Sequence, residues 1–361
     1  MKPRNVAIAC GVAGAAVGLA AASGIVYRKQ IKSAASLKRL TDYADGYDLY
    51  AIDIAYDYDL DRIIAADVRD DQAYIDAVVA QVLPGVPAHV QAPQFACSAF
   101  AAVDAEGRVR TGRNYDFKDD TSALLVRNQP RDGYASIGFA ALNNLGNNAP
   151  LDSIAGRAAA LMGPFAQLDG VNECGVSIAV LTLDSKPCDQ DTQRPVINTS
   201  LAIRLVLDRA ATTQEAVDLL SAYDMHAMAG RDYHFFINDA AGDARVVEWD
   251  PRDPDRACKA TPVRQVTNFY ACYGDEVLPN QKNDELGHGK ERAVAIADVL
   301  DAHAGAQDEA VAWKALRAAA QEPNPEDITS NTQWSVVFDN TEPAATITLR
   351  RHWGDTEAFA L

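Results

Sequence analysis

Short apolar runs separated by turn residues are the main pattern of the chain from residue 95 onward, and they predict strands. Three pairs of such runs flank a turn and predict β-hairpins, over residues 95–103 with 108–115, 233–238 with 244–249, and 334–339 with 345–350. Two further runs predict single strands over residues 175–183 and 263–269. The turn Asp104-Ala-Glu-Gly107 closes the first hairpin.

Longer segments between these strands predict helices, over residues 199–209, 214–223, 290–303 and 308–321. Thr212-Thr-Gln-Glu215 forms a capping box for the second of them. Hairpins, then helices, then further hairpins favour a layered α+β fold over a parallel βαβ sheet.

The first 30 residues are interpreted as a targeting segment. Residues 6–27 form an uncharged, mostly apolar run with basic residues on both sides. Such a run is either a transmembrane anchor or a signal peptide cleaved near Ala20-Ala-Ala22. The basic residues after the run favour a cytoplasmic location for that side, which conflicts with export. Our hypothesis is nevertheless a cell-envelope protein, exported or membrane-anchored, with the catalytic domain outside, whose N-terminal segment contacts the membrane or the export machinery.

Residues 31–96 are interpreted as a prosegment, an N-terminal helical region with a helix predicted over residues 73–83. Pro84, Pro87 and Pro93 then interrupt regular structure just before residue 97, as is typical of an exposed processing site. The alternative is an ordinary helical subdomain with a linker. Residues 97–361 form the predicted catalytic domain.

Composition narrows the class of protein. A chain of 361 residues with 48% hydrophobic and 23% charged residues is typical of a globular protein. A net charge of −17 argues against nucleic-acid binding. The chain has six cysteines, of which Cys10 lies in the apolar run and Cys97 is discussed below. The other four either pair in an exported domain or remain free thiols, namely Cys174, Cys188, Cys258 and Cys272.

The first hairpin carries the candidate chemistry. Cys97 lies at the start of its first strand, and the returning strand brings Arg113 and Asp116. A nucleophilic thiol needs a nearby cation and a base. No histidine lies in the hairpin, but a chain cut before Cys97 would have an α-amino group with a pKa of about 7.7–8.0, which could serve as that base.

Cys97-Ser-Ala-Phe100 followed by Gly112-Arg-Asn-Tyr-Asp-Phe117 resembles the start of the linear amide C–N hydrolases. That family includes choloylglycine (bile salt) hydrolases and penicillin V acylases, within the N-terminal nucleophile (Ntn) superfamily. Other landmarks follow in the same order, at Asp169-Gly-Val-Asn172-Glu-Cys-Gly175, Thr267-Asn268, Glu291-Arg292 and Trp334-Ser-Val-Val-Phe-Asp339. The resemblance covers the chain from Cys97 to the C-terminus and implies a four-layer αββα sandwich.

The resemblance also implies a role for each matching residue. Cys97 would be the nucleophile, Arg113 would lower its pKa and help bind substrate, and Asp116 would bind the freed α-amino group. Oxyanion donors would come from the Asn268 side chain and the Thr182 backbone N–H, while Asn172 and Arg292 would support the site. Bile salt hydrolases tend to carry Asn at the position of Thr182, so the chain departs from them there.

The expected reaction is hydrolysis of a linear amide in a small molecule, of the N-acyl amino acid, bile salt or penicillin V type, through an acyl-thioester and without metal or organic cofactor. The resemblance also allows a homo-oligomer, since relatives often form tetramers. Three alternatives stay open. They are acyl transfer to an amine by the same cysteine, a non-catalytic envelope protein that keeps the fold, and a thiol protease that uses a distant histidine.

Overall fold

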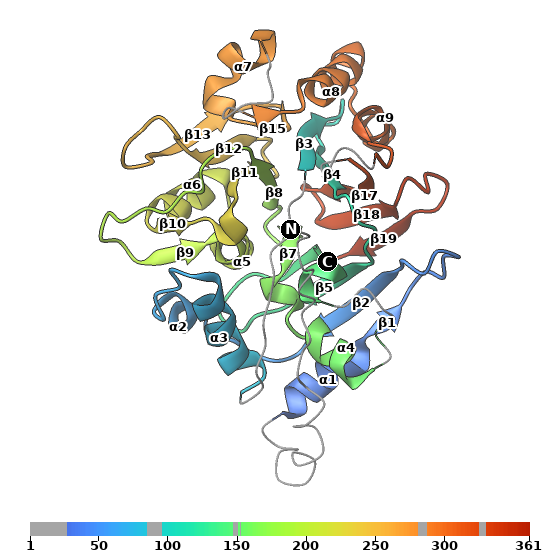
Figure 1. Ribbon diagram of the computed structural model, residues 1–361. Helices are drawn as coiled ribbons and strands as arrows, with labels where there is room; N and C mark the ends of the chain where they lie inside the picture. The colour runs from blue at the N-terminus through green and yellow to red at the C-terminus, as the bar shows by residue number, and fades with distance from the viewer. Residues whose placement is uncertain (1–26, 85–95, 147–150, 152, 281–286, 325–329) are drawn as a thin grey trace.

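The computed structural model describes residues 27–84, 96–146, 151, 153–280, 287–324 and 330–361. Two large β-sheets form the centre of the molecule (Figure 1). The larger has nine strands in the order β1-β2-β5-β6-β7-β8-β11-β12-β13. These strands are Lys38–Arg39, Leu49–Ile54, Ala123–Asn128, Ser136–Ala141, Gln167–Asn172, Ser177–Leu183, Asp232–Asn238, Arg245–Trp249 and Cys258–Pro262.

The second sheet has six strands in the order β14-β3-β4-β17-β18-β19, all antiparallel. They are Gln265–Val266, Ala96–Val103, Val109–Asp116, Thr332–Asp339, Ala344–Leu349 and Glu357–Ala360. Two small ribbons pair β9 (Val196–Asn198) with β10 (Asp224–His226), and β15 (Asn268–Phe269) with β16 (Gly287–His288).

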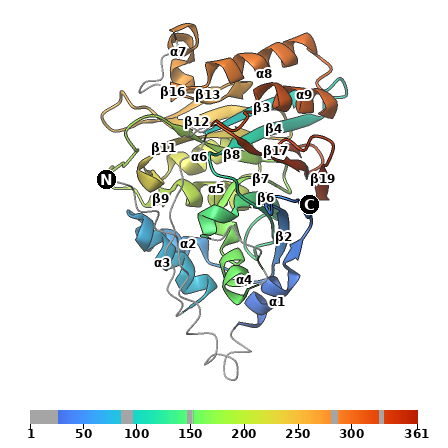
Figure 2. The same ribbon diagram turned by 45° about the vertical axis from the view of Figure 1, so that its right-hand side comes forward.

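The two sheets pack face to face, and helices cover their outer faces. Strands β3 and β17 of the smaller sheet lie against β8 and β7 of the larger one. Helices α5 (Thr199–Arg209) and α6 (Thr213–Ser221) cover the larger sheet, and α8 (Lys290–Ala302) and α9 (Glu309–Ala319) cover the smaller one. Figure 2 shows these layers in turn, from α8 and α9 through both sheets to α5. The predicted four-layer αββα sandwich is therefore confirmed.

Most predicted elements are found within a few residues of their expected bounds. All three hairpins pair as antiparallel strands, as β3–β4, β11–β12 and β17–β18. The predicted helices are α5, α6, α8 and α9. Only one of the two hydrogen bonds of the capping box forms as predicted. Thr212 Oγ1 accepts from the Glu215 N–H at 3.1 Å, but the Glu215 carboxylate accepts from the N–H of Ala211 and not from that of Thr212.

The predicted strand over residues 263–269 is divided between two sheets. Val266 pairs with Ala99 of β3, but Asn268 two residues later pairs with His288 of β16. The chain therefore leaves the six-stranded sheet immediately before Asn268, and this departure determines where the Asn268 side chain lies.

The N-terminal region joins the catalytic fold and is helical only in part. Its helices are α1 (Arg28–Ser36), α2 (Leu60–Ile64) and α3 (Asp71–Val82), the last of which confirms the helix predicted over residues 73–83. Between them, β2 pairs in parallel with β5 and so becomes a strand of the nine-stranded sheet. The apolar side chains of Leu49–Ile54 are buried there, which explains why this segment is a strand.

The expected targeting segment and most of the expected processing connection lie outside the described residues. Within the described ranges, no helix is both long enough and apolar enough to cross a membrane. The remaining helices are α4 (Ile154–Ala160) and α7 (Gly274–Asn280), with 3-10 turns η1 (Leu142–Leu145), η2 (Gly163–Phe165), η3 (Met228–Gly230) and η4 (Ala271–Tyr273).

Candidate active site

Cys97 lies in β3, where it is the register partner of Tyr115 in β4. Its side chain is fully buried, and Arg113 Nη2 donates to its Sγ at 3.3 Å. Burial raises the pKa of the Cys97 thiol to about 12, and Arg113 and the Asp116 backbone N–H oppose that rise without overcoming it. Arg113 lowers the pKa of the Cys97 thiol, as the resemblance implies, but in the uncut chain the desolvation penalty exceeds the attraction of this cation and the pKa stays raised. The thiol needs a base.

Arg113 is the fully buried cation of the site. Its Nη1 forms an ion pair with Asp169 at 2.9 Å, and its Nη2 donates to the Val180 carbonyl at 3.0 Å. The register of β7 with β8 ends at the pair Asp169–Ala179, so Val180 is the first residue of β8 beyond that ladder. Arg113 thus fills the notch where the two strands separate. In the sequence Asp169 stands out only as part of a family landmark, so its role as the counterion was missed.

Asn268 binds the backbone on the N-terminal side of the thiol. Its Oδ1 accepts from the Cys97 N–H at 3.1 Å and from Arg292 Nη2 at 2.8 Å, while its Nδ2 donates to the Thr182 carbonyl at 2.8 Å. Two donors on one side and a carbonyl on the other fix the orientation of the amide. Processing before Cys97 would turn this backbone N–H into the α-amino group, in hydrogen-bond contact with Asn268.

Arg292 joins the remaining groups from the first turn of α8. Its Nη1 donates to the Cys97 carbonyl at 2.7 Å and lies 3.3 Å from Asp116 Oδ2. The left-handed N-cap Gly289 (φ 89°) makes room for this guanidinium, since a Cβ there would lie 2.5 Å from Arg292 Nη2. The chain turns sharply into α8 at this point and directs Arg292 at the nucleophile's own backbone.

Asp116 is fully buried at the end of β4. Thr332 Oγ1 donates to it at 2.6 Å and Gln321 Nε2 at 2.9 Å. Burial raises the pKa of the Asp116 carboxyl, and Arg292 and these hydrogen bonds oppose the rise. The expected direct bond from the Cys97 nitrogen to Asp116 is absent from the described contacts, where that nitrogen donates to Asn268 instead. Asp116 reaches the nucleophile through Arg292 and through its own backbone N–H.

Two further predicted residues lie at different distances from this centre. Thr182 is next to it, with its carbonyl accepting from Asn268; the predicted role of its N–H as an oxyanion donor stays a prediction. Asn172 ties the β7–β8 turn to α5, because its Oδ1 accepts from the Val176 N–H and its Nδ2 donates to the Ala210 carbonyl. The fold therefore brings together six of the seven predicted residues, and Asn172 supports the sheet that holds them.

The described cysteines are all free thiols, so within that part of the chain the alternative of disulfide pairing is wrong. Cys174 lies in the turn between β7 and β8. No group of three or more His, Cys, Asp or Glu side chains within the described ranges is arranged to hold a metal ion.

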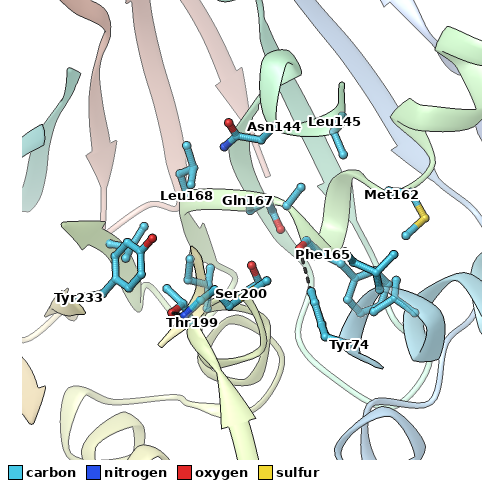
Figure 3. A pocket seen from close by; sticks show the side chains of 16 residues that line it. Tyr74, Asn144, Leu145, Met162, Phe165, Gln167, Leu168, Thr199, Ser200 and Tyr233 are labelled. Carbon is cyan, nitrogen blue, oxygen red and sulfur yellow. Dashed lines mark hydrogen bonds between the residues drawn. The ribbon is translucent and has the colours of Figure 1, made fainter. Parts of the chain in front are cut away.

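An apolar pocket (Figure 3) shares one residue, Val180, with the notch filled by Arg113. Val180 links the two, because its carbonyl accepts from Arg113 and its side chain lines the pocket. Three secondary-structure elements supply most of the other walls. They are α3 with Tyr74, Ile75 and Val78, α5 with Thr199, Ser200 and Ile203, and the segment from Met162 to Leu168. One wall therefore comes from the N-terminal region, on the far side of the expected cleavage point.

Two loops, over residues 143–153 and 186–195, are the candidates for selecting the substrate, although neither carries a recognisable sequence motif. Asn144 and Leu145 of η1 line the pocket, so the start of the loop over residues 143–153 does contribute to it. Residues 147–150 and 152 of that loop lie outside the described part of the chain. No residue of 186–195 is among the described lining residues.

Replacing Gly289 by alanine is expected to weaken the site specifically. Alanine at a left-handed position costs roughly 1–2 kcal/mol, and the added Cβ displaces Arg292 from Asn268 and Cys97. Gly305→Ala is the matched control, since Gly305 also has positive φ (77°) but a Cβ added there would meet no atom within 4 Å. We expect both variants to lose unfolding free energy, measured by urea titration, with the larger loss in Gly289→Ala because its added Cβ also meets Arg292 and Thr267, and only Gly289→Ala to lose at least tenfold in amide hydrolysis. Equal activities would contradict the role given to Arg292.

Comparison with known proteins supports this assignment of the fold. The model of the family described as acyl-coenzyme A:6-aminopenicillanic acid acyl-transferase matches residues 103–352, well over half of the chain. The match begins after Cys97. No curated protein sequence matches the chain significantly.

Solved structures share the architecture at low sequence identity. A conjugated bile acid hydrolase from Clostridium perfringens, in a cysteine-to-alanine variant, is 15% identical with a TM-score of 0.57, over 73% of this chain and 92% of that one. A penicillin V acylase from Agrobacterium tumefaciens is 20% identical with a TM-score of 0.51, over 70% of this chain and 83% of that one. Both are Ntn hydrolases, and their likeness to this chain shows the fold.

Proposed function

The chain belongs to the acyl-coenzyme A:6-aminopenicillanic acid acyl-transferase family, and from this membership we propose that it hydrolyses a linear amide with Cys97 as an N-terminal nucleophile. Cleavage between residues 96 and 97 would free the α-amino group. The observation that carries the proposal is the convergence on Cys97 of Arg113 at its sulfur, Asn268 at its nitrogen and Arg292 at its carbonyl. A structural cysteine in an apolar strand has no need of two buried arginines.

The steps of the proposed reaction follow from this geometry. The α-amino group of Cys97 takes the thiol proton, because a sulfur with a pKa near 12 is protonated at neutral pH. The thiolate attacks the amide carbonyl, and Arg113, 3.3 Å from Sγ, offsets the negative charge. The candidate donors to the oxyanion are the Thr182 N–H and Asn268 Nδ2, which in the described structure donates to the Thr182 carbonyl and, at 3.3 Å, to Thr182 Oγ1. One such donor typically changes the rate by about 10²–10³. The amine leaves, and water hydrolyses the acyl-thioester.

The pocket beside Val180 is the candidate acyl site. Its lining is mostly apolar, and it is linked to the thiol through Val180, a lining residue whose carbonyl accepts from the same Arg113 that donates to Cys97 Sγ. An apolar acyl group placed there would bury its surface while the carbonyl lies at Cys97, with each buried methylene contributing roughly 0.8 kcal/mol. We therefore propose an amide with an apolar acyl half as the substrate class.

Acyl transfer to an amine is the second candidate, and the description of the matching family favours it. The same residues would form the same acyl-thioester, so the two candidates differ only in the acceptor. Incubating the protein with an N-acyl amino acid and a second, free amine distinguishes them. Free acid as the main product indicates hydrolysis, and the new amide indicates transfer. A folded, processed protein that gives neither product would contradict both.

A substitution on α3 tests whether the N-terminal region shapes the acyl site. Val78→Phe is expected to fill the pocket and to lower kcat/KM for a long acyl chain by about 10–100-fold relative to an acetyl amide. Val79→Phe is the matched control, because Val79 is also buried on α3 but does not line the pocket, and overpacking costs both variants about 1–3 kcal/mol. An unchanged chain-length preference in Val78→Phe would show that the acyl group binds elsewhere.

A further inference from the structure

A second polar cluster lies one strand pairing away from Asn268, and the mechanism above does not use it. His288 of β16 is the register partner of Asn268. Its Nδ1 lies 2.5 Å from Asp184 Oδ2, and Arg231 Nη1 lies 3.3 Å from Asp184 Oδ1. Asp184 directly follows the end of β8, two residues after Thr182.

The Asp184 carboxylate determines which ring nitrogen of His288 carries the proton. Asp184 can only accept, so the Nδ1 of His288 carries a proton and the other nitrogen is available for a partner. That Nε2 is buried and has no hydrogen-bond partner among the described residues, while the whole side chain is only 13% exposed. A buried unpaired ring nitrogen is costly, which points to a partner that arrives with a ligand. The Cys97 thiol is not that partner in the described structure.

The cluster also lies on the correct side of the reaction centre. Val180 and Thr182 lie two residues apart in β8 and therefore on the same face of that strand, and Asp184 follows two residues later, just beyond the end of the strand. The Val180 side chain lines the acyl pocket, Thr182 contacts Asn268, and Asp184 holds His288. Each step of two residues advances about 6.6 Å along a strand. An amide with its acyl group in the pocket and its carbonyl at Asn268 therefore directs its amine half toward His288.

We infer that His288 is a catalytic residue for the amine half of the substrate, and that it protonates the departing amide nitrogen through Nε2. The inference rests on the proposed function. In the acylation step the thiol proton passes to the α-amino group and the C–S bond forms. The C–N bond then breaks as its nitrogen takes the proton from the His288 imidazolium.

The cycle closes without any further reagent. During deacylation His288 takes one proton from the attacking water, whose oxygen bonds to the acyl carbon. The C–S bond breaks and the sulfur takes back the proton held by the α-ammonium group. Asp184 supports the charged imidazole: although burial acts to raise it, the pKa of the Asp184 carboxyl is lowered by His288 and Arg231.

Paired substrates that differ only in the leaving group test this role. The leaving group of N-octanoylglycine is the amine of glycine, which is basic and needs a proton to depart. The leaving group of p-nitrophenyl octanoate is p-nitrophenolate, which is weakly basic and departs without one. We expect His288→Gln to lower kcat/KM for the amide by about 10²–10⁴-fold and to change kcat/KM for the ester, which reports acylation and not the later deacylation, less than threefold. Asp184→Asn should lower amide hydrolysis in the same selective way, by a smaller factor.

His226→Gln is the matched control, because His226 Nδ1 also lies against a carboxylate, Asp189, at 3.1 Å. It should leave both reactions unchanged. Two results in His288→Gln would overturn the inference. An equal loss of kcat/KM for the amide and the ester would indicate a structural role or a histidine that acts as the base for the thiol. An unchanged kcat/KM for both substrates would show that His288 takes no part in the reaction. The proposed function is tested separately. It requires that the wild-type protein hydrolyses the ester and that this hydrolysis is lost in Cys97→Ala.

Discussion

Cys97→Ala will abolish amide hydrolysis, lowering kcat/KM by roughly 10⁴-fold or more, as expected when a nucleophile is removed. The variant loses the sulfur that forms the acyl-thioester and also, on our proposal, the group that cleaves the chain. It should fold normally, because a methyl group occupies less space in a fully buried site and removes no charge. Hydrolysis of an amide panel, followed by chromatography of the free amine, measures the loss.

A second buried thiol provides the control. Cys188 is 1% exposed, and burial raises the pKa of its thiol to about 12 as it does for Cys97. Cys188 is neither paired with Arg113 nor close to Asn268 in the described contacts. Cys188→Ala should therefore retain wild-type activity. Similar activity in the two alanine variants would support the non-catalytic alternative.

Arg113→Met is expected to have the largest effect on both stability and activity outside Cys97. Removing the cation leaves the Asp169 carboxylate buried without its partner, at a cost of roughly 3–5 kcal/mol. Burial already raises the pKa of Asp169 and Arg113 opposes that rise, so Asp169 in the variant is expected to take up a proton. Activity should fall by at least 10²-fold, because the thiolate loses its cation. Urea unfolding and amide hydrolysis measure the two effects.

The double variant Arg113→Met with Asp169→Asn separates stability from chemistry. Asparagine keeps an oxygen for the Trp334 Nε1–H, which donates to Asp169 at 3.1 Å, and removes the unpaired charge. The free energy of unfolding should recover by at least ~2 kcal/mol while activity stays low. Recovery of activity together with stability would show that Arg113 supports the fold and takes no part in the reaction.

The sequence predicted the catalytic half of the fold well because its signals are local. The β3–β4 hairpin follows from two apolar runs around Asp104-Ala-Glu-Gly107, and α5 follows from a periodic segment with Asn198 at its N-cap. The N-terminal region was harder to predict. Leu49–Ile54 becomes a strand only because β5, more than 70 residues later in the chain, offers it an edge, and such long-range pairing leaves no local pattern.

The site shows the same division between local and distant information. Cys97, Arg113 and Asp116 lie on one hairpin and could be found together from the sequence. Asn268 and Arg292 were placed by family resemblance, and the structure brings both to Cys97. Asp169 and Gln321 come from distant segments, and no sequence pattern predicts that they lie beside the hairpin. Nor does a pattern predict that His288 pairs with Asn268. The state of the thiol was missed because burial, which raises its pKa, is a property of the folded chain.

The measurement that tests the central claim most directly is intact mass with N-terminal sequencing of the purified protein, beside Cys97→Ala. We expect the wild-type protein to contain a fragment that begins at Cys97, and the variant to remain uncut. The N-terminal fragment should co-purify, since β2 pairs with β5 and α3 lines the acyl pocket. An uncut, folded and active wild-type chain would contradict the account, because the buried thiol would then work without an α-amino base.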